Sequence, residues 1–485
     1  MRRPLHRVLL PLAYALGAAG CSLPAEFAQT ASDPRAAVGG AEASPLPTEP
    51  DCPDDLAARL EVTRIDVDGD IRYKVPRYDK YPFDDRIALA IARDGHAFVA
   101  WTALAGGLHV TPLDAQLVRS APDVLVDGVD IGGLIAHERG FALLTRRDDP
   151  DEALSDPTST AENPVSAAFL VRYEDRTQVF AAPLTGTRSI TAESEPTTHD
   201  CATGSIQIAR LAWNGVRYGA YFHAHSCGGI SRALGYADKL VYADDRGRHV
   251  PGGWDRNCDL SLGVRLLAEP GAFTGVCLSD RLPFPGVDLV TEGVPARQLS
   301  AEYTATNFAA ASLGSIVKVP ADGSYVLGWL SRGVSTADGR VAAAKSAYDI
   351  ALLRLGSDYQ VLEPKRWFLE TPDVAELNLH IAAYGRDRLL LTWERIEAPR
   401  CTERTCWGPY SGTRAQIIDL NGNPLSPETA IDAPPNALED IAVFPNGDVG
   451  WAFVADEQRS YEEPLDSSDI PGKRQLSIAR LRVCE

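Results

Sequence analysis

The feature of this sequence that most constrains its fold is a short motif that recurs along the chain. An apolar run leads into a tight turn with glycine and then into a second apolar run, which in the clearest copies ends in tryptophan. Clear copies end at Trp101, Trp329, Trp393 and Trp451, and weaker copies end at Thr145, Tyr221 and Cys277. Asp-Gly and Asn-Gly supply the positive φ angles of tight turns, so each copy is predicted to be a β-hairpin.

The arrangement of the hairpins predicts an all-β fold. Each hairpin is followed by a further strand-like segment, such as AFLVRYEDR or DIALLRLGSD, and successive hairpins are 44 to 76 residues apart. Units of this size cannot bury their own faces, so they must stack on their neighbours in a closed ring. We therefore predict a β-propeller over residues 58–485, with ordered structure beginning near Leu60. Seven four-stranded blades fit best, although the weak copies leave six or eight open, and the N-terminal strand is expected to complete the last blade. The terminal tryptophans are predicted to pack between blades.

The N-terminus has the features of an export signal. MRRPLHR is followed by the apolar stretch VLLPLAYALGAAG and then by Cys21, and this stretch is too short to span a bilayer. The segment Ala18-Ala19-Gly20-Cys21 resembles the lipobox of bacterial lipoproteins. The resemblance implies a signal peptide over residues 1–20 and an acylated Cys21. Because Ser22 follows the cysteine, the resemblance also implies attachment to the outer membrane, on its periplasmic or its outer surface. An ordinary secretory signal cut nearby is the alternative, and both place the protein outside the cytoplasm.

A tether is predicted between the anchor and the propeller, over residues 21–57. Its main part is rich in Ala, Pro, Ser and Gly and has no strand or helix periodicity. Such a segment has too little apolar surface to offset the entropy of ordering it.

The net charge argues against nucleic acid as a partner. The chain carries −19, which becomes −22 once Arg2, Arg3 and Arg7 are removed with the leader. A surface this acidic repels phosphate backbones, and no basic run offsets it.

Eight cysteines remain after Cys21, and an even number in an exported chain suggests disulfides. Sequence alone allows 105 pairings of eight cysteines, but the repeat favours four of them. Ring closure brings the two ends of the propeller together and so predicts Cys52–Cys484. The other favoured pairs are Cys201–Cys227, Cys258–Cys277 and Cys401–Cys406.

One face of the predicted ring carries nearly all the extra length. The turns within each hairpin are short, whereas the loops on the opposite face are long and hold most of the cysteines. Loops on a rigid scaffold commonly bind partners, so this long-loop face is the expected binding surface, with loops that bind nothing as the alternative. Trp254, Trp407 and Tyr410 are expected to form exposed aromatic platforms there, or else to cover blade ends.

The sequence contains few signs of catalysis or metal binding. His223 and His225 form an H-x-H pair that is a weak metal candidate, and no motif for a cofactor is present. The prediction is a monomeric, non-enzymatic binding or scaffold lipoprotein of the cell envelope, without cofactor, that meets the membrane through its lipid anchor and holds a protein or glycan. The alternatives are a propeller hydrolase or lyase with acids and His223 near the axis, and a structural envelope protein.

Overall fold

The computed structural model describes fifteen segments of the chain: residues 55–73, 86–148, 166–184, 199–202, 208–227, 237–259, 261–279, 285–303, 311–335, 340–343, 347–362, 367–369, 373–401, 406–454 and 473–484. In these segments the one α-helix is the single turn α1 (Leu56–Arg59), and none of their helices has the length and apolar character needed to cross a membrane. The predicted leader lies outside these residues, and so does the predicted tether up to residue 54. Residues 55–57, which were expected to belong to the tether, are part of the folded domain instead, because Leu56 is buried in an apolar core.

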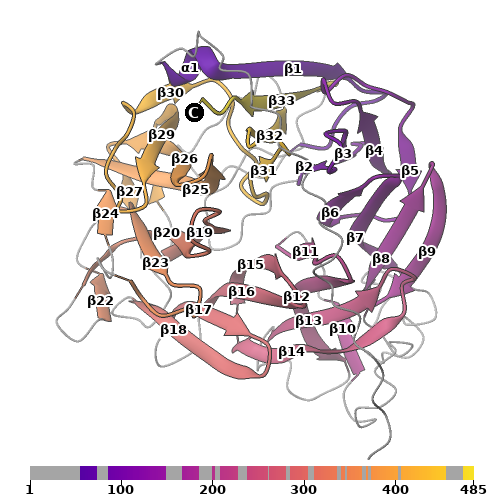
Figure 1. Cartoon of the computed structure of the whole chain (residues 1–485), viewed down its shortest axis with the longest axis horizontal. Helices are drawn as coiled ribbons and strands as arrows, with labels where there is room; N and C mark the ends of the chain where they lie inside the picture. The colour runs from indigo at the N-terminus through magenta and orange to yellow at the C-terminus, as the bar shows by residue number, and fades with distance from the viewer. Residues whose placement is uncertain are drawn as a thin grey trace, which may run out of the picture. The chain divides into compact units, whose positions relative to one another are not determined.

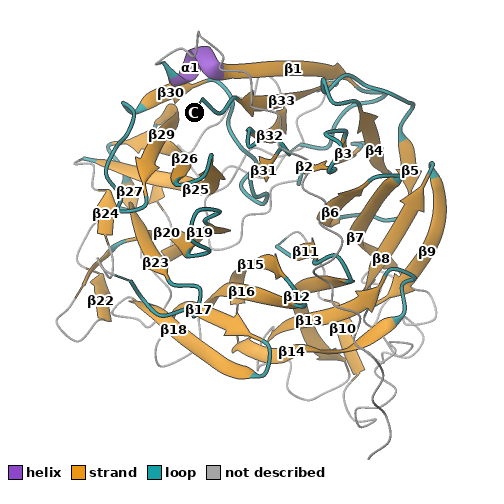
Figure 2. Ribbon diagram, in the orientation of Figure 1, coloured by secondary structure: helices purple, strands orange, loops and turns teal. Residues whose placement is uncertain are grey.

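Seven antiparallel four-stranded units surround a central axis (Figure 1), which confirms the predicted seven-bladed propeller. Figure 2 shows these strands in orange and the described loops and turns that join them in teal. The strands of each blade are given from the axis outward. Blade 1 contains β2 (Ala88–Ile91), β3 (Ala97–Thr102), β4 (Leu108–Leu113) and β5 (Val124–Val126), and blade 2 contains β6 (Ile131–His137), β7 (Gly140–Asp148), β8 (Ser166–Glu174) and β9 (Thr177–Pro183). Blade 3 contains β11 (Arg210–Trp213), β12 (Arg217–Cys227), β13 (Ala237–Asp244) and β14 (His249–Asp259).

The next three blades follow the same order. Blade 4 contains β15 (Ser261–Glu269), β16 (Ala272–Ser279), β17 (Gly286–Thr291) and β18 (Val294–Tyr303). Blade 5 contains β19 (Ala311–Lys318), β20 (Tyr325–Ser331), β23 (Asp349–Leu355) and β24 (Trp367–Leu369). Blade 6 contains β25 (Val374–Tyr384), β26 (Arg388–Glu397), β29 (Tyr410–Asp419) and β30 (Thr429–Ile431).

Blade 7 closes the ring with strands from both ends of the chain. Its inner strands are β31 (Ala442–Val443), β32 (Val449–Val454) and β33 (Gln475–Leu481), and its outermost strand is β1 (Leu60–Asp66). β1 runs antiparallel to β33, with Leu60 opposite Leu481. The predicted closure by the N-terminal strand is therefore confirmed.

Five further short strands lie outside the four-stranded blades. β10 (His199–Ala202) lies in the connection from blade 2 to blade 3, whereas β21 (Gly333–Ser335) and β22 (Arg340–Ala343) lie in a loop of blade 5, and β27 (Arg400–Cys401) and β28 (Cys406–Trp407) in a loop of blade 6. β10 pairs with β12 and, at one position, with β8, so it joins the sheets of blades 2 and 3. β22 runs parallel to β18 and covers the outer edge of blade 4. Covering an edge in this way removes a template for unwanted strand pairing.

Seven apolar cores hold the ring together, one at each interface between neighbouring blades. Trp101, Trp329, Trp393 and Trp451 are each buried in one of these cores, as predicted. Burying an indole also requires a partner for its N–H group. The Trp329 N–H donates to Glu302 of blade 4 at 2.8 Å, which links two blades through a polar contact as well as an apolar one.

Two predicted disulfides are confirmed, and one of them lies elsewhere in the blades than expected. Cys401–Cys406 closes the small hairpin β27–β28. Cys258–Cys277 connects the outer strand of blade 3 to β16 of blade 4, so it joins two blades instead of tying a loop within one blade.

The other two predicted pairs are not settled. Cys484 takes part in a disulfide, while its predicted partner Cys52 lies outside the described residues. In the backbone, Cys201 lies opposite His225 and Cys227 opposite His199, but their side chains are outside the described part of the chain.

We expect Cys484→Ser to melt at a lower temperature than the wild-type protein. A Cys52–Cys484 bond closes nearly the whole chain, which corresponds to roughly 4 to 5 kcal/mol of stabilisation. Cys406→Ser is the matched control, because its short loop corresponds to about 2 kcal/mol. Non-reducing peptide mapping identifies the partner of Cys484, and recovery of Cys52 as a free thiol would contradict the predicted pair.

Candidate functional site at the propeller axis

One position of the repeat forms a ring of residues around the axis. In every blade this residue stands immediately before an Ile or Leu of the innermost strand or of the segment that leads into it. From blade 1 to blade 7 these residues, here called the axial ring, are Arg86, Gly133, Arg210, Arg265, Ser315, His380 and Asp440. Equivalent positions in the blades of a propeller lie at similar heights along the axis, so the ring gathers side chains from distant parts of the chain.

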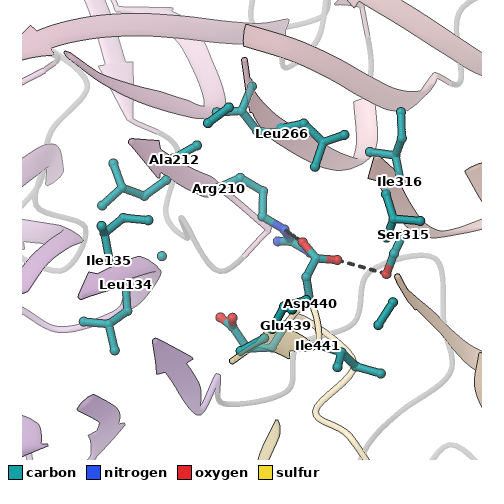
Figure 3. A pocket seen from close by; sticks show the side chains of 18 of the residues that line it. Leu134, Ile135, Arg210, Ala212, Leu266, Ser315, Ile316, Glu439, Asp440 and Ile441 are labelled. Atoms are coloured by element: carbon teal, nitrogen blue, oxygen red, sulfur yellow. Dashed lines mark hydrogen bonds and ion pairs between the residues drawn. The ribbon is translucent and has the colours of Figure 1, made fainter. Parts of the chain in front are cut away.

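The carboxylate of Asp440 links blade 7 to blades on the opposite side of the ring. Its carboxylate pairs with the Nε of Arg210 at 3.1 Å and with the Nε of Arg265 at 3.1 Å. The hydroxyl of Ser315 donates to the same carboxylate at 3.0 Å. Arg210 and Ser315 are seen to reach Asp440 in Figure 3. One side chain thus connects blade 7 to blades 3, 4 and 5.

Arg86 connects blade 1 to the same group. Its guanidinium pairs with Glu439, the neighbour of Asp440. Its Nη1 also donates to the carbonyl oxygens of Gly132 at 2.7 Å and Ala209 at 2.8 Å. These carbonyls belong to blades 2 and 3, whose innermost strands have no strand neighbour on the axial side. The arginine therefore satisfies backbone acceptors that would otherwise need water.

Blade 6 joins through Asn378. The side-chain amide of Asn378 donates to the Pro435 carbonyl at 3.0 Å and to Glu394 at 2.7 Å, and its oxygen shares a hydrogen bond with His380 Nε2 at 2.9 Å. Pro435 lies in the buried segment that leads from blade 6 to Glu439. We call Arg86, Arg210, Arg265, Glu439 and Asp440 the axial charge cluster. Its contacts connect blade 7 with blades 1 to 5, and Asn378 ties blade 6 to the segment that carries Glu439 and Asp440.

Burial and charge shift the titration of this cluster. Burial, together with repulsion from Arg210, lowers the pKa of Arg265 to about 9. Burial also lowers the pKa of Arg86 to about 10, despite the attraction of Glu439. Burial alone would raise the pKa of Asp440, but Arg265 and Arg210 outweigh it and hold that pKa below its usual value. For Glu439 burial prevails over Arg86 and raises the pKa.

A cavity of about 400 Å³ lies along the axis beside the cluster (Figure 3). Arg86, Arg210, Ser315, Glu439 and Asp440 form its polar end. Its walls come from the ends of the innermost strands that approach the short turns, for example Leu266–Ala268 of β15 and Ile381–Ala383 of β25. Ala268 and Val443 line it and are exposed to solvent, so the cavity opens toward the short-turn face.

The prediction of an exposed platform at Trp254 is wrong. Its segment forms β14 instead of a loop, and the indole is buried in the core between blades 3 and 4. Its N–H donates to Asp238 at 2.9 Å, and its ring packs edge-on against Tyr221. A side chain at Gly275 would clash with this ring, since an added Cβ would meet it at 2.8 Å.

The other predicted site residues are less well defined. Trp407 is half-buried beside the Cys401–Cys406 disulfide, and half-buried Tyr410 packs on the core between blades 5 and 6. For His223 and His225 the structure gives the strand β12 but not the side chains, so the metal prediction is untested. In the described residues, one group of possible metal ligands is close enough together, but it contains the Cys258–Cys277 disulfide, whose sulfur atoms are not thiolates.

The residues of the axial charge cluster were not predicted from the sequence. The signal is weak, because a polar residue or glycine stands before an Ile or Leu in all seven repeats, but its distance from the glycine of the hairpin turn varies from five to nine residues. The pairing could not be read from spacing, since Arg210 and Asp440 are 230 residues apart.

Comparison with known proteins places the chain in no family. No family model matches it, and no curated protein matches its sequence. Among solved structures, it is similar to a protein of unknown function from Dyadobacter fermentans (11% identity, 87% of this chain and 99% of that chain, TM-score 0.36). It is also similar to the WD40 domain of SCAP from fission yeast (10% identity, 88% and 99%, TM-score 0.37). A third is a subtype N11 neuraminidase-like protein of A/flat-faced bat/Peru/033/2010 (9% identity, 74% and 96%, TM-score 0.35). At this level the similarities carry no argument about function.

We expect Asp440→Asn to destabilise the protein by about 2 kcal/mol at pH 7. Removing one partner of a fully buried ion pair costs about 3 to 5 kcal/mol, and the 40% exposure of the Asp440 side chain reduces that cost. Because the pKa of Asp440 is lower in the folded than in the unfolded chain, its stabilisation is complete above about pH 4 and is lost as the pH falls further.

The difference in melting temperature between wild type and Asp440→Asn should therefore shrink from pH 6 to pH 3. Asp432→Asn is the control, because Asp432 lies in the same connection but is exposed. A constant difference across this pH range would contradict the assignment.

Proposed function

We propose that this propeller is a non-enzymatic binding protein that holds a small ligand in its axial cavity. The observation that carries the proposal is the cavity itself, about 400 Å³ with a charged end and largely apolar walls. Small-molecule sites commonly have about 300 to 1,000 Å³ and combine apolar walls with a few convergent polar groups. The expected long-loop face lies largely outside the described residues and lacks Trp254 as an anchor, so it supports the proposal less well.

Catalysis by the axial acids is the second candidate. The raised pKa of Glu439 and the presence of His380 in the axial ring favour it. Two features weigh more against it. Asp440 is held ionised by Arg210 and Arg265 and is a poor proton donor. His380 is fully buried, hydrogen-bonds to Asn378 and does not line the cavity. General acid–base catalysis needs groups within hydrogen-bond reach of the substrate.

The location follows from the leader. We propose export, acylation of Cys21 and attachment to the outer membrane, with residues 22–54 as the tether to the propeller. The partners there would be envelope glycans or proteins. Mass spectrometry of the N-terminus tests this proposal, and an unmodified terminus at another residue would contradict it.

The binding proposal is tested by narrowing the mouth of the cavity. A thermal-shift screen of sugars, amino acids, peptides and small organic acids first identifies ligands of the wild-type protein. Ala268→Phe places a large side chain at the exposed rim without touching the axial charge cluster, and we expect the affinity for each ligand to fall at least tenfold, about 1.4 kcal/mol.

Val216→Phe is the matched control, because Val216 is exposed in the turn between β11 and β12 and does not line the cavity. It should bind like the wild type. Ligands that bind Ala268→Phe as tightly as the wild type, or a screen without any ligand, would refute the proposal.

A further inference from the structure

The accessible groups at the polar end of the cavity are acceptors. The side chain of Asp440 is 40% exposed and that of Glu439 is 15% exposed, whereas those of Arg86 and Arg210 are 1% and 5% exposed. Arg265 is similarly buried and does not line the cavity. At this end of the cavity a ligand therefore meets carboxylate oxygens, with the guanidinium groups behind them. The lining also includes Lys318, which is 42% exposed and whose ammonium group is paired with Glu269.

The walls offer backbone groups as well as side chains. Consecutive residues line the cavity in several blades, such as Arg210–Trp213 and Ser315–Lys318, so the edge of each of these strands faces the axis. Each innermost strand pairs with a neighbour strand on one side only. Its other edge therefore presents N–H donors and C=O acceptors to whatever occupies the cavity.

The charges of the cluster argue against a charged ligand. Three arginines face two carboxylates, so the cluster has no negative excess that would attract a cation. An anion would have to approach the exposed oxygens of Asp440 and Glu439, while the guanidinium groups that would attract it are covered. Each carboxylate is already neutralised in place, yet it retains lone pairs that can accept further hydrogen bonds.

We propose that the axial cavity binds a neutral polyhydroxylated ligand of one or two sugar rings. Hydroxyl groups donate to the Asp440 and Glu439 carboxylates and exchange hydrogen bonds with Ser315 and the strand edges, while the C–H faces of the ring pack on walls such as Leu266 and Ile316. The cavity volume is at the low end of the range for small-molecule sites, which limits the ligand to this size. This inference rests on the proposed binding function and specifies its ligand class.

A charge series of sugars tests the ligand class. Isothermal titration calorimetry first ranks neutral mono- and disaccharides, including glucose and galactose, against the wild-type protein. The best neutral monosaccharide is then compared with its uronic acid and its amino sugar. We expect the neutral form to bind at least tenfold more tightly than either charged form. The ammonium group of the amino sugar would be repelled by the positive excess of the cluster, and the carboxylate of the uronic acid would meet the exposed oxygens of Asp440 and Glu439.

Two variants locate the site. Asp440→Asn keeps the shape but removes the charge that strengthens the hydrogen bonds, and we expect about tenfold weaker binding of the neutral sugar. Ser315→Ala removes one hydroxyl at the polar end and should weaken binding about threefold to tenfold while preserving the ion pairs of Asp440. Ser411→Ala is the matched control, because Ser411 is half-buried in β29 and does not line the cavity.

The possible results separate the ligand class from the binding function. A uronic acid or amino sugar that binds more tightly than the neutral sugar overturns the class, as does a wild-type protein that binds another class of ligand but no sugar. Loss of these other ligands in Ala268→Phe would still support the cavity as a binding site. Neutral sugars that bind Ser315→Ala and Asp440→Asn like the wild type overturn the location.

Discussion

The closed ring depends on hydrogen-bond partners for the unpaired backbone groups of the seven innermost strands, which meet at the axis. Each of these strands has one edge without a strand partner, and seven such edges converge. The axial charge cluster addresses this directly. Arg86 donates to carbonyls of blades 2 and 3, while Asp440 binds side chains of blades 3, 4 and 5. Because the contacts cross the ring, they stabilise only the closed arrangement.

The apolar cores and the axial charge cluster stabilise the closed ring in different ways. Each core binds one blade to its neighbour and contributes through burial of side chains such as Trp101 or Trp451. The cluster joins blades that are not neighbours. It also leaves one end of the cavity polar, so the same residues that close the ring create the features of the candidate binding site. A change in the cluster is therefore expected to affect both stability and binding.

The fold was largely predictable from the sequence, because the hairpin motif repeats local information seven times. Tight turns and the tryptophans before loops fixed the blades, and the position of Cys484 with the last strand indicated the closure by β1. The error at Trp254 arose because glycines and a proline in PGGW suggested a loop, whereas Gly252 and Gly253 adopt positive φ within β14. Its packing on blade 4 is a tertiary contact that local pattern does not encode.

The candidate site was less predictable. Its residues come from one position of the repeat, but their types differ from blade to blade, so they share no motif. The pairing between Arg210 and Asp440 depends on the diameter of the closed ring and on which blades face each other across the axis. The Ile or Leu that follows each axial-ring residue is not the first one of its innermost strand in most blades, as Leu313 and Leu377 show, so the sequence gives no fixed point from which to align the set.

A double-mutant cycle between Arg210 and Asp440 tests the central claim that this cluster connects blades across the axis. The free energy of unfolding is measured for the wild type, Arg210→Met, Asp440→Asn and the double variant. We expect the two single changes to interact by about 1 to 3 kcal/mol, since contacting charged residues are coupled on this scale. Additivity within about 0.5 kcal/mol, the behaviour of independent sites, would contradict the account.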